Sequence, residues 1–218
     1  MEYSVVIPIY NEEGNVKTLH KEILEAMKGL SESKDFEIMY INDGSTDSTL
    51  NELSKLKSAK IINLNRNYGQ ATAIDAGFKE AQGEIIISLD GDLQNDPKDI
   101  PKLIEKLKKD NLDVVAGWRK KRSDKKGFKV LTKIGRFFRR LLIKDIVNDT
   151  GCTLRVYKKT AAKSLDLQGE MHRYILGLLN WKGFKIGEIE VNHRKRENGY
   201  SKYTYTKAIR GFIDLLYI

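Results

Sequence analysis

The chain has 218 residues, of which 40% are apolar, enough to build one large core, and its 32% charged residues with only three prolines argue against disorder. A single cysteine, Cys152, excludes an internal disulfide framework and favours a reducing compartment, and three scattered histidines show no zinc spacing. The net charge of +9 is concentrated after Trp118, which indicates an anionic partner there: phosphate groups, a membrane surface or nucleic acid.

The first 118 residues alternate strand-like apolar runs with segments whose apolar residues recur at helical spacing. Strands are predicted over Tyr3–Ile9, Phe36–Ile41, Lys60–Leu64, Glu84–Leu89 and Leu112–Ala116. Helices are predicted over Val16–Leu30, Ser48–Leu56, Ala71–Ala81 and Pro97–Lys108, the last because proline favours the first helical position. This order predicts an α/β fold, with a mostly parallel sheet covered by helices on both faces.

The composition changes after Trp118, where a basic loop begins at Arg119. The later predicted elements are an amphipathic basic helix over Lys129–Ile146, an apolar segment over Leu154–Tyr157, a helix over Glu170–Leu179, a strand over Ile186–Val191 and an amphipathic helix over Thr206–Ile218. The two amphipathic helices suit a lipid headgroup interface, and simple packing against the sheet is the alternative. No signal peptide is predicted, and no apolar run approaches the about 20 residues of a membrane-spanning helix.

Polar motifs follow each of the first five predicted strands. They are Pro8-Ile9-Tyr10-Asn11-Glu12, Asn42-Asp43-Gly44-Ser45, Asn65-Arg66-Asn67-Tyr68-Gly69, Asp90-Gly91-Asp92-Leu93-Gln94 and Gly117-Trp118-Arg119. Parallel sheets bind ligands at the carboxyl ends of their strands, so these motifs are expected to share one edge. Turns also need polar and glycine residues, but five such motifs on one edge favour a binding site.

The Asp90-Gly91-Asp92 motif is the predicted metal site. Residues i and i+2 of a strand point to the same side, so both carboxylates are expected to face one way, with the amide oxygen of Gln94 nearby. Such oxygen ligands suit Mg²⁺ or Mn²⁺, which would neutralise a diphosphate leaving group. The alternative is a solvated acidic turn.

Asp43 has two interpretations. Its carboxylate can accept hydrogen bonds from a nucleotide base or ribose, or it can cap the following turn. Asp47 is the better candidate for a purely structural cap, because it lies near the start of the next predicted helix.

Taken in order, the motifs resemble the family 2 inverting glycosyltransferases of the GT-A fold. The resemblance to the family rests on the segments Val6–Glu13, Asn42–Asp47 and Leu89–Gln94. The branch that uses polyprenyl phosphates is indicated by four further segments: Asp96-Pro97, Asp149–Cys152, Glu170–Tyr174 and Gly199–Lys202. That branch contains dolichol-phosphate mannose synthases and undecaprenyl-phosphate glucosyltransferases. The family more often has Asp-Asp-Gly-Ser where this chain has Asn42-Asp43, a change that keeps the second carboxylate.

The resemblance implies roles for individual residues. Those expected to bind the nucleotide sugar are Pro8, Tyr10, Glu12, Asp43, Arg66, Gly69 and Asp90, together with Ser201 and Lys202 of a loop that closes over the site. Those expected to hold the metal and diphosphate are Asp90, Asp92 and Gln94, and the expected catalytic residues are Asp92, Arg119, Asp149 and Arg173. Arg119 matches an arginine that contacts phosphate in this branch.

The resemblance also implies an organisation and a location. A catalytic domain is expected over residues 1–202, with a nucleotide-sugar and metal half (1–118) and an acceptor half (119–202), followed by a juxtamembrane helix (203–218). The expected partners are a nucleotide-sugar donor, a polyprenyl-phosphate acceptor and the cytoplasmic face of a membrane, with no nucleic acid. Many relatives continue into membrane-spanning helices. Anchoring here would therefore depend on a longer form of the chain, on the interfacial helices or on a partner subunit.

Three other functions compete with this interpretation. A glycosyltransferase acting on a glycan or protein hydroxyl would need a general base, for which Asp149 and Glu170 are the candidates. A phosphatase with an Asp-x-Asp nucleophile has Thr or Val where this chain has Gln94. A nucleic-acid binder is suggested by the charge alone, without a recognition helix or an aromatic platform.

Overall fold

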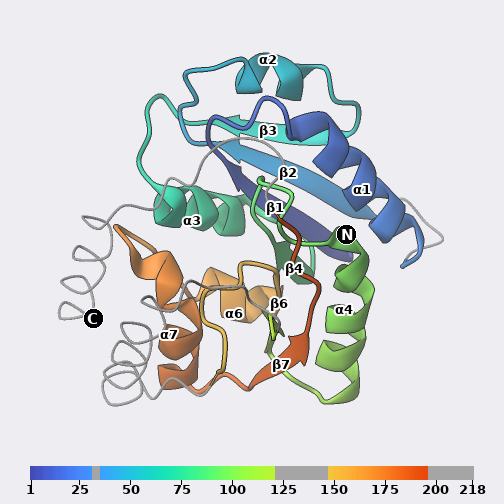
Figure 1. Cartoon of the computed structure of the whole chain (residues 1–218). Helices are drawn as coiled ribbons and strands as arrows, with labels where there is room; N and C mark the ends of the chain where they lie inside the picture. Colours follow the sequence, from blue (N-terminus) through green and yellow to red (C-terminus); the bar gives the residue numbers. More distant parts are fainter. Residues whose placement is uncertain (31–34, 121–146, 196–218) are drawn as a thin grey trace.

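The computed structural model describes residues 1–30, 35–120 and 147–195. Its core is a seven-stranded sheet in the order β3-β2-β1-β4-β6-β5-β7 (Figure 1). The strands are β1 (Tyr3–Ile9), β2 (Phe36–Asn42), β3 (Ala59–Asn63), β4 (Ile85–Ser88), β5 (Val114–Trp118), β6 (Arg155–Lys158) and β7 (Ile186–Glu190). β1 to β4 pair in parallel, and β6 runs antiparallel to both β4 and β5, so the predicted mostly parallel sheet is confirmed.

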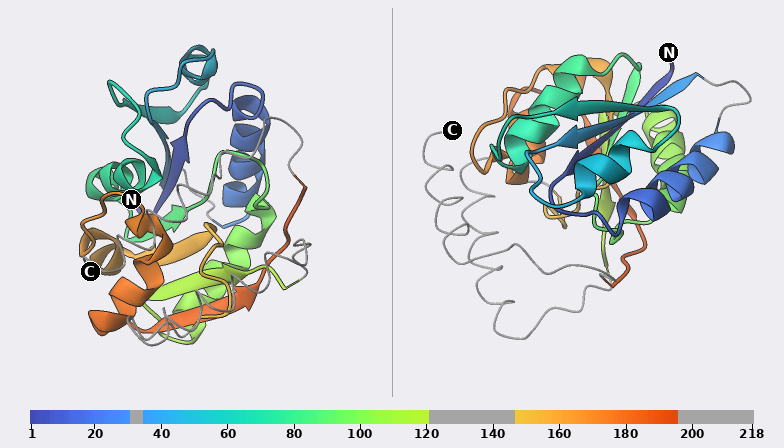
Figure 2. Two further views of the ribbon diagram at one scale, coloured as in Figure 1. Left: turned by 60° about the vertical axis from the view of Figure 1, so that its left-hand side comes forward. Right: turned by 90° about the horizontal axis from the view of Figure 1, so that it is seen from above.

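Helices cover both faces of this sheet (Figure 2). They are α1 (Val16–Lys28), α2 (Thr49–Ser54), α3 (Gln70–Glu80), α4 (Ile100–Lys109), α6 (Lys159–Lys163) and α7 (Ile175–Trp181), with 3₁₀ turns η1 (Pro97–Asp99) and η2 (Met171–Arg173). Side chains alternate between the two faces along β1 and so belong to two cores. Val5 and Ile7 belong to the core that includes residues of α1 and α4, and Val6 belongs to the core that includes residues of α3, α6 and α7. Among the described helices, none is long and apolar enough to cross a bilayer.

Several predicted boundaries were wrong. Pro97 begins the 3₁₀ turn η1 rather than α4, because the Asp96 carboxylate accepts the Lys98 N–H and fixes a tight turn before Ile100. The helix predicted over Glu170–Leu179 is divided at Tyr174 into η2 and α7, and the short helix α6 was not predicted. Gly117 and Trp118 belong to β5, because their backbones pair with β7, so only Arg119 of that motif follows the strand.

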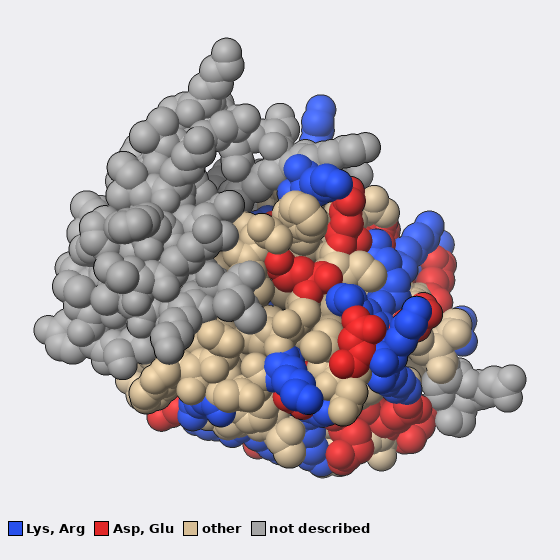
Figure 3. All heavy atoms as spheres, turned by 90° about the horizontal axis from the view of Figure 1, so that it is seen from below, with Lys and Arg blue, Asp and Glu red and all other residues tan. Residues whose placement is uncertain are grey.

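The described surface carries mixed charges. On the face shown in Figure 3, lysine and arginine side chains are interspersed with aspartate and glutamate. Residues 121–146 contain ten Lys or Arg against two Asp, which accounts for most of the surplus positive charge of the chain. The predicted amphipathic helices over 129–146 and 206–218, and the loop residues Ser201 and Lys202, lie outside the described residues.

Candidate active site

A cavity of about 190 Å³ opens where the carboxyl ends of β1, β2 and β4 meet. Its lining residues are Pro8, Ile9, Tyr10, Glu12, Asp43, Asn67, Gly69, Gln70, Ala73, Asp90, Gly91 and Asp92. The chain proceeds outward from β1 to β2 and β3, and then returns to place β4 on the other side of β1. The cavity therefore lies at the topological switch point of the sheet, where open α/β sheets bind their ligands.

Asp90 and Asp92 both line this cavity, although not for the predicted reason. β4 ends at Ser88, so the two carboxylates lie in the following turn and not in an extended strand. The turn is fixed by the Asp92 carboxylate, which accepts the Gln94 N–H at 3.1 Å, and by Leu93, whose φ is +62°. Gln94 is absent from the residues that line the cavity, and its backbone carbonyl instead accepts the Arg194 N–H at 2.9 Å.

The electrostatics at Asp90 favour a bound cation. Burial and then the charge of Asp92 raise the pKa of the Asp90 carboxyl, whereas a hydrogen bond from Thr153 and the charges of Arg155 and Arg119 act in the opposite direction. A divalent cation between the two carboxylates would relieve their repulsion. Within the described residues, no group of three or more His, Cys, Asp or Glu could hold a metal by itself. The pair therefore fits a metal whose remaining ligands are water and phosphate.

Gln70 was missed by the sequence reasoning and belongs to this site. Its side-chain amide donates to Asp90 Oδ1 at 2.6 Å, from the first residue of α3. Gly69 precedes it with φ +100°, a conformation that glycine adopts without steric cost. The only sequence signal was the position of Gln70 directly after a predicted glycine turn.

Asp43 shapes the side of the cavity that is formed by the β3–α3 loop. It is 3% exposed, and its carboxylate accepts the N–H groups of Tyr68 and Gly69 at 2.7 and 2.9 Å. It therefore holds the β3–α3 loop, and the Asx cap of its own turn comes from Asn42, whose Oδ1 accepts the Ser45 N–H at 3.3 Å. Asp47 is a cap as predicted, because its carboxylate accepts the Thr49 N–H at 2.9 Å.

The remaining predicted nucleotide residues are placed as follows. Pro8 and Tyr10 line the cavity, as does Glu12, whose carboxylate accepts the Asn15 amide at 2.6 Å. Arg66 is not among the lining residues, and its guanidinium stacks over the Tyr68 ring at 4.7 Å from the ring centre.

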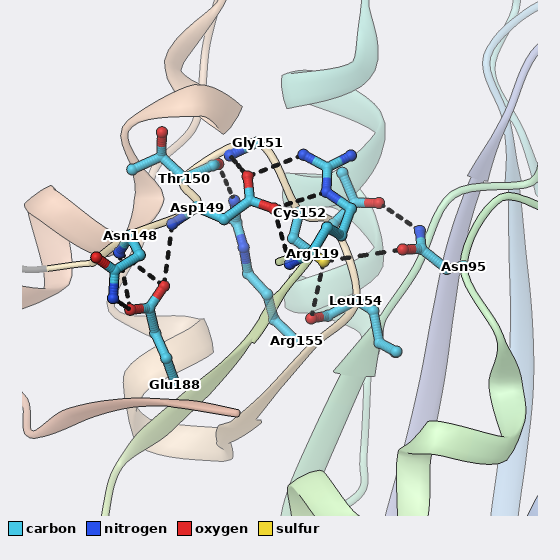
Figure 4. Close-up of polar contacts among 11 residues, drawn as sticks. Asn95, Arg119, Asn148, Asp149, Thr150, Gly151, Cys152, Leu154, Arg155 and Glu188 are labelled. Atoms are coloured by element: carbon cyan, nitrogen blue, oxygen red, sulfur yellow. Dashed lines mark hydrogen bonds and ion pairs between the residues drawn. The ribbon is translucent and has the colours of Figure 1, made fainter. Parts of the chain in front are cut away.

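Arg119 and Asp149 form a largely buried ion pair (Figure 4). The carboxylate of Asp149 accepts Arg119 Nε at 2.7 Å, Nη2 at 2.9 Å and the backbone N–H at 3.1 Å. Burial opposes the charge on Arg119, but the hydrogen bonds and charge of Asp149 raise its pKa, so the guanidinium remains charged. The side chains are 11% and 10% exposed, so the pair joins the end of β5 rigidly to the turn before β6.

Arg173 lies in a different ion pair, with Glu170 of the segment before η2 at 2.8 Å. His172 lines a second, smaller cavity together with Asp90, so η2 approaches the turn that contains the paired aspartates. Most of the residues predicted to bind the nucleotide and the metal thus line one cavity, whereas Arg66 and Gln94 do not. Arg119 lies with Asp149, and Arg173 lies with Glu170.

The fold and site are those of an α/β protein with a paired-aspartate cavity at the switch point of its sheet. The model of the family "Glycosyl transferase family 2" matches residues 4–166, and the chain belongs to that family.

Two curated relatives match over nearly the whole chain. The dodecaprenyl-phosphate galacturonate synthase of Rhizobium johnstonii is 40% identical and matches 99% of the chain. The undecaprenyl-phosphate 4-deoxy-4-formamido-L-arabinose transferase of Pectobacterium carotovorum is 39% identical and matches 98%. The chain spans 66% of the length of each of these two relatives.

A solved structure confirms the predicted GT-A type of fold. Glucosyl-3-phosphoglycerate synthase from Mycobacterium tuberculosis, in complex with Mn²⁺, UDP and glucosyl-3-phosphoglycerate, superposes with a TM-score of 0.77 at 17% identity. The match covers 99% of this chain and 79% of that one. At this identity the likeness concerns the fold alone.

Proposed function

We propose that this protein transfers a hexose, with inversion, from a UDP- or GDP-sugar to a polyprenyl phosphate at the cytoplasmic face of a membrane. The observation that carries the proposal is the pair Asp90 and Asp92 at the switch-point cavity, with Asp43 and Tyr10 on its other walls. The names of the two curated relatives support the lipid-phosphate acceptor, although the sugars in those names differ from one another.

The roles follow from the placement of the residues. Asp90 and Asp92 would hold Mg²⁺ or Mn²⁺, which when bound would neutralise the diphosphate leaving group. Gln70 fixes the Asp90 carboxylate by its hydrogen bond at 2.6 Å. Asp43 holds the loop that contributes Asn67 and Gly69 to the nucleotide pocket. Gln94 as a metal ligand and Ser201 with Lys202 as a closing loop remain predictions of the family resemblance.

The acceptor side favours a nucleophile that is already charged. Asp149 already accepts hydrogen bonds from Arg119 and Gly151, and Glu170 is paired with Arg173. Neither carboxylate is therefore placed to act as the general base that a hydroxyl acceptor would need. A lipid phosphate is an anion near neutral pH and needs positioning more than a general base. Arg119 and Arg173 would position it, because a guanidinium carries five N–H donors and can bind a phosphate as well as its carboxylate partner.

The test measures transfer from radiolabelled UDP- and GDP-sugars to a short-chain polyprenyl phosphate, with Mn²⁺, Mg²⁺ or EDTA. The expected result is a lipid-soluble product that forms only with metal, and that Asp92→Asn abolishes while the protein remains folded. Transfer to glycans or peptides, with none to polyprenyl phosphate, would favour the hydroxyl-acceptor alternative. An unchanged rate in Asp92→Asn would reject the metal site.

A further inference from the structure

A second, smaller cavity adjoins the candidate active site. Its volume is about 10 Å³, which is room for about one water molecule. It shares Pro8 and Asp90 with the larger cavity, and its other lining residues are Ile74, Ser88, Leu89, Thr153, Arg155, Tyr157, His172 and Ile175. Asp90 therefore lies between the larger cavity and this smaller one.

Arg155 Nε and the Tyr157 hydroxyl are among the buried polar atoms of the residues that line the smaller cavity. Arg155 Nε and the Tyr157 hydroxyl are fully shielded from solvent and have no hydrogen-bonding partner within the described part of the chain. Arg155 is 3% exposed and Tyr157 is 0% exposed. A buried polar group without a partner is costly, and more so when it is charged, so these two donors favour a polar occupant of the cavity.

Arg155 connects the two sides of the candidate site. Arg155 lies on β6 and pairs with Ser88 of β4, and Ser88 precedes Asp90 by two residues. Its Nη2 donates to the carbonyl of Thr150 at 2.7 Å, in the turn whose Asp149 is paired with Arg119 (Figure 4). Within the described residues, no ion pair joins Arg155 to a carboxylate, and the positive charge of Arg155 lowers the pKa of the Asp90 carboxyl. One buried guanidinium therefore contacts the acceptor-side turn and also lines the cavity next to Asp90.

We infer that Arg155 and Tyr157 are positioning residues for Asp90, and that they act through one water molecule held in the smaller cavity. The water accepts the Arg155 Nε–H, hydrogen-bonds to the Tyr157 hydroxyl and donates to the Asp90 carboxylate. Three polar partners are typical for a buried water. The inference rests on the proposed function, because the importance of holding Asp90 derives from its proposed role as a metal ligand.

The first test is a crystal structure at a resolution that shows ordered water. We expect density for one water within about 3.2 Å of both Arg155 Nε and the Tyr157 hydroxyl. An empty cavity, or one filled by a rearranged side chain, would overturn the inference. This result does not depend on whether the protein is a glycosyltransferase.

The second test measures the affinity for Mn²⁺ in the presence of UDP by titration calorimetry. Arg155→Gln is expected to weaken Mn²⁺ binding about tenfold, the lower end of the loss that follows removal of a residue supporting a metal ligand. Arg194→Gln is the matched control, because Arg194 pairs with Glu22 and Asp96 and lines neither cavity. It should bind Mn²⁺ within about twofold of the unaltered protein.

Tyr157→Phe keeps the test decisive if Arg155→Gln does not fold. If the hydroxyl holds a water, its removal should lower both the Tm and the affinity for Mn²⁺. If the hydroxyl is unpaired, the variant should be as stable as the parent or more stable, and the inference fails. Absence of Mn²⁺–UDP binding in the unaltered protein would instead reject the proposed function and leave the water to crystallography.

Discussion

At the scale of single residues, burial determines which reactive side chains are available for chemistry. Cys152 is 0% exposed and lies against Asn95 and the Leu154 carbonyl. Burial raises the pKa of its thiol to about 11. Although Cys152 lies within the turn that follows Asp149, its role is therefore packing.

Cys152 should resist thiol reagents in the folded protein. At about pH 8 its thiol is protonated and inaccessible, so we expect negligible reaction with DTNB in buffer. In urea the same reagent should titrate one thiol per chain, because the sequence contains one cysteine. Rapid reaction of the folded protein would show that the turn around Asp149 opens readily.

His20 is the second residue whose chemistry is set by burial. Its Nε2 donates to the Lys57 carbonyl at 3.0 Å, and its Nδ1 accepts the Tyr40 hydroxyl at 3.3 Å, an arrangement that requires the neutral ring. Burial lowers the pKa of His20, although the hydrogen bond to Lys57 acts in the opposite direction. The unfolded chain therefore binds this proton more readily than the folded protein.

The free energy of unfolding should decrease as the pH falls from the unfolded histidine pKa toward the lower folded pKa of His20. Above the unfolded pKa, His20 should cause no such decrease. The measurement is the free energy of unfolding in urea at about pH 7.5 and pH 5.5. In His20→Gln, which can still donate to the Lys57 carbonyl, the decrease should be smaller. Equal decreases in both proteins would show that other groups cause the acid sensitivity.

At the scale of elements, the part of the cavity around Asp43 depends on contacts between loops that are distant in sequence. Gly44 has φ +62°, and a Cβ built there would lie 2.3 Å from the backbone carbon of Arg66. The β2–α2 turn therefore packs directly against the β3–α3 loop, which Asp43 also holds.

Gly44→Ala should destabilise the protein by about 2 kcal/mol, because the substitution combines a left-handed backbone with a backbone clash. It should also weaken nucleotide binding by displacing the loop that contains Asn67 and Gly69. Gly29→Ala is the control, since its added Cβ would meet only the Ala26 carbonyl at 3.7 Å. If the two variants unfold at the same urea concentration, the two loops are not tightly packed.

The sequence predicted the helices and strands better than it predicted which side chains contact one another. The apolar periodicities located β1 to β4 and α1 to α3 closely, because each is a local pattern. The position of Gln70 against Asp90 and of Arg155 against Thr150 depends on strand order and register, which no local pattern encodes. The turn containing Asp90 and Asp92 was predicted as an extension of a strand, because a left-handed residue such as Leu93 gives no composition signal.

At the scale of the whole molecule, the sheet brings the two sides of the site together. β6 lies between β4 and β5, so residues 155–158 separate the strand before Asp90 from the strand before Arg119. The antiparallel direction of β6 could not be predicted, because a short apolar strand has the same composition in either direction. The division into a donor half (1–118), an acceptor half (119–202) and a juxtamembrane helix (203–218) remains a prediction.

Binding of metal and nucleotide together should stabilise the whole molecule. A ligand that binds only the folded state adds about 2.7 kcal/mol at a hundredfold excess over its Kd. In a domain of this size that corresponds to a rise of about 5–10 °C in Tm. We expect this rise with Mn²⁺ and UDP added together, and a much smaller one with either alone, because in the proposed site Asp90 and Asp92 would hold the metal that neutralises the diphosphate.

Two controls test whether the metal is required for the rise in Tm. EDTA should abolish the rise in Tm. Asp92→Asn should show no rise with Mn²⁺ and UDP. Without ligand, the Tm of this variant should stay close to that of the unaltered protein, since the Asp92 side chain lies at the cavity and outside the apolar core. An equal rise in EDTA would mean that the nucleotide binds without metal. Asp43 and the β3–α3 loop would then account for donor binding, and the paired aspartates would need another explanation.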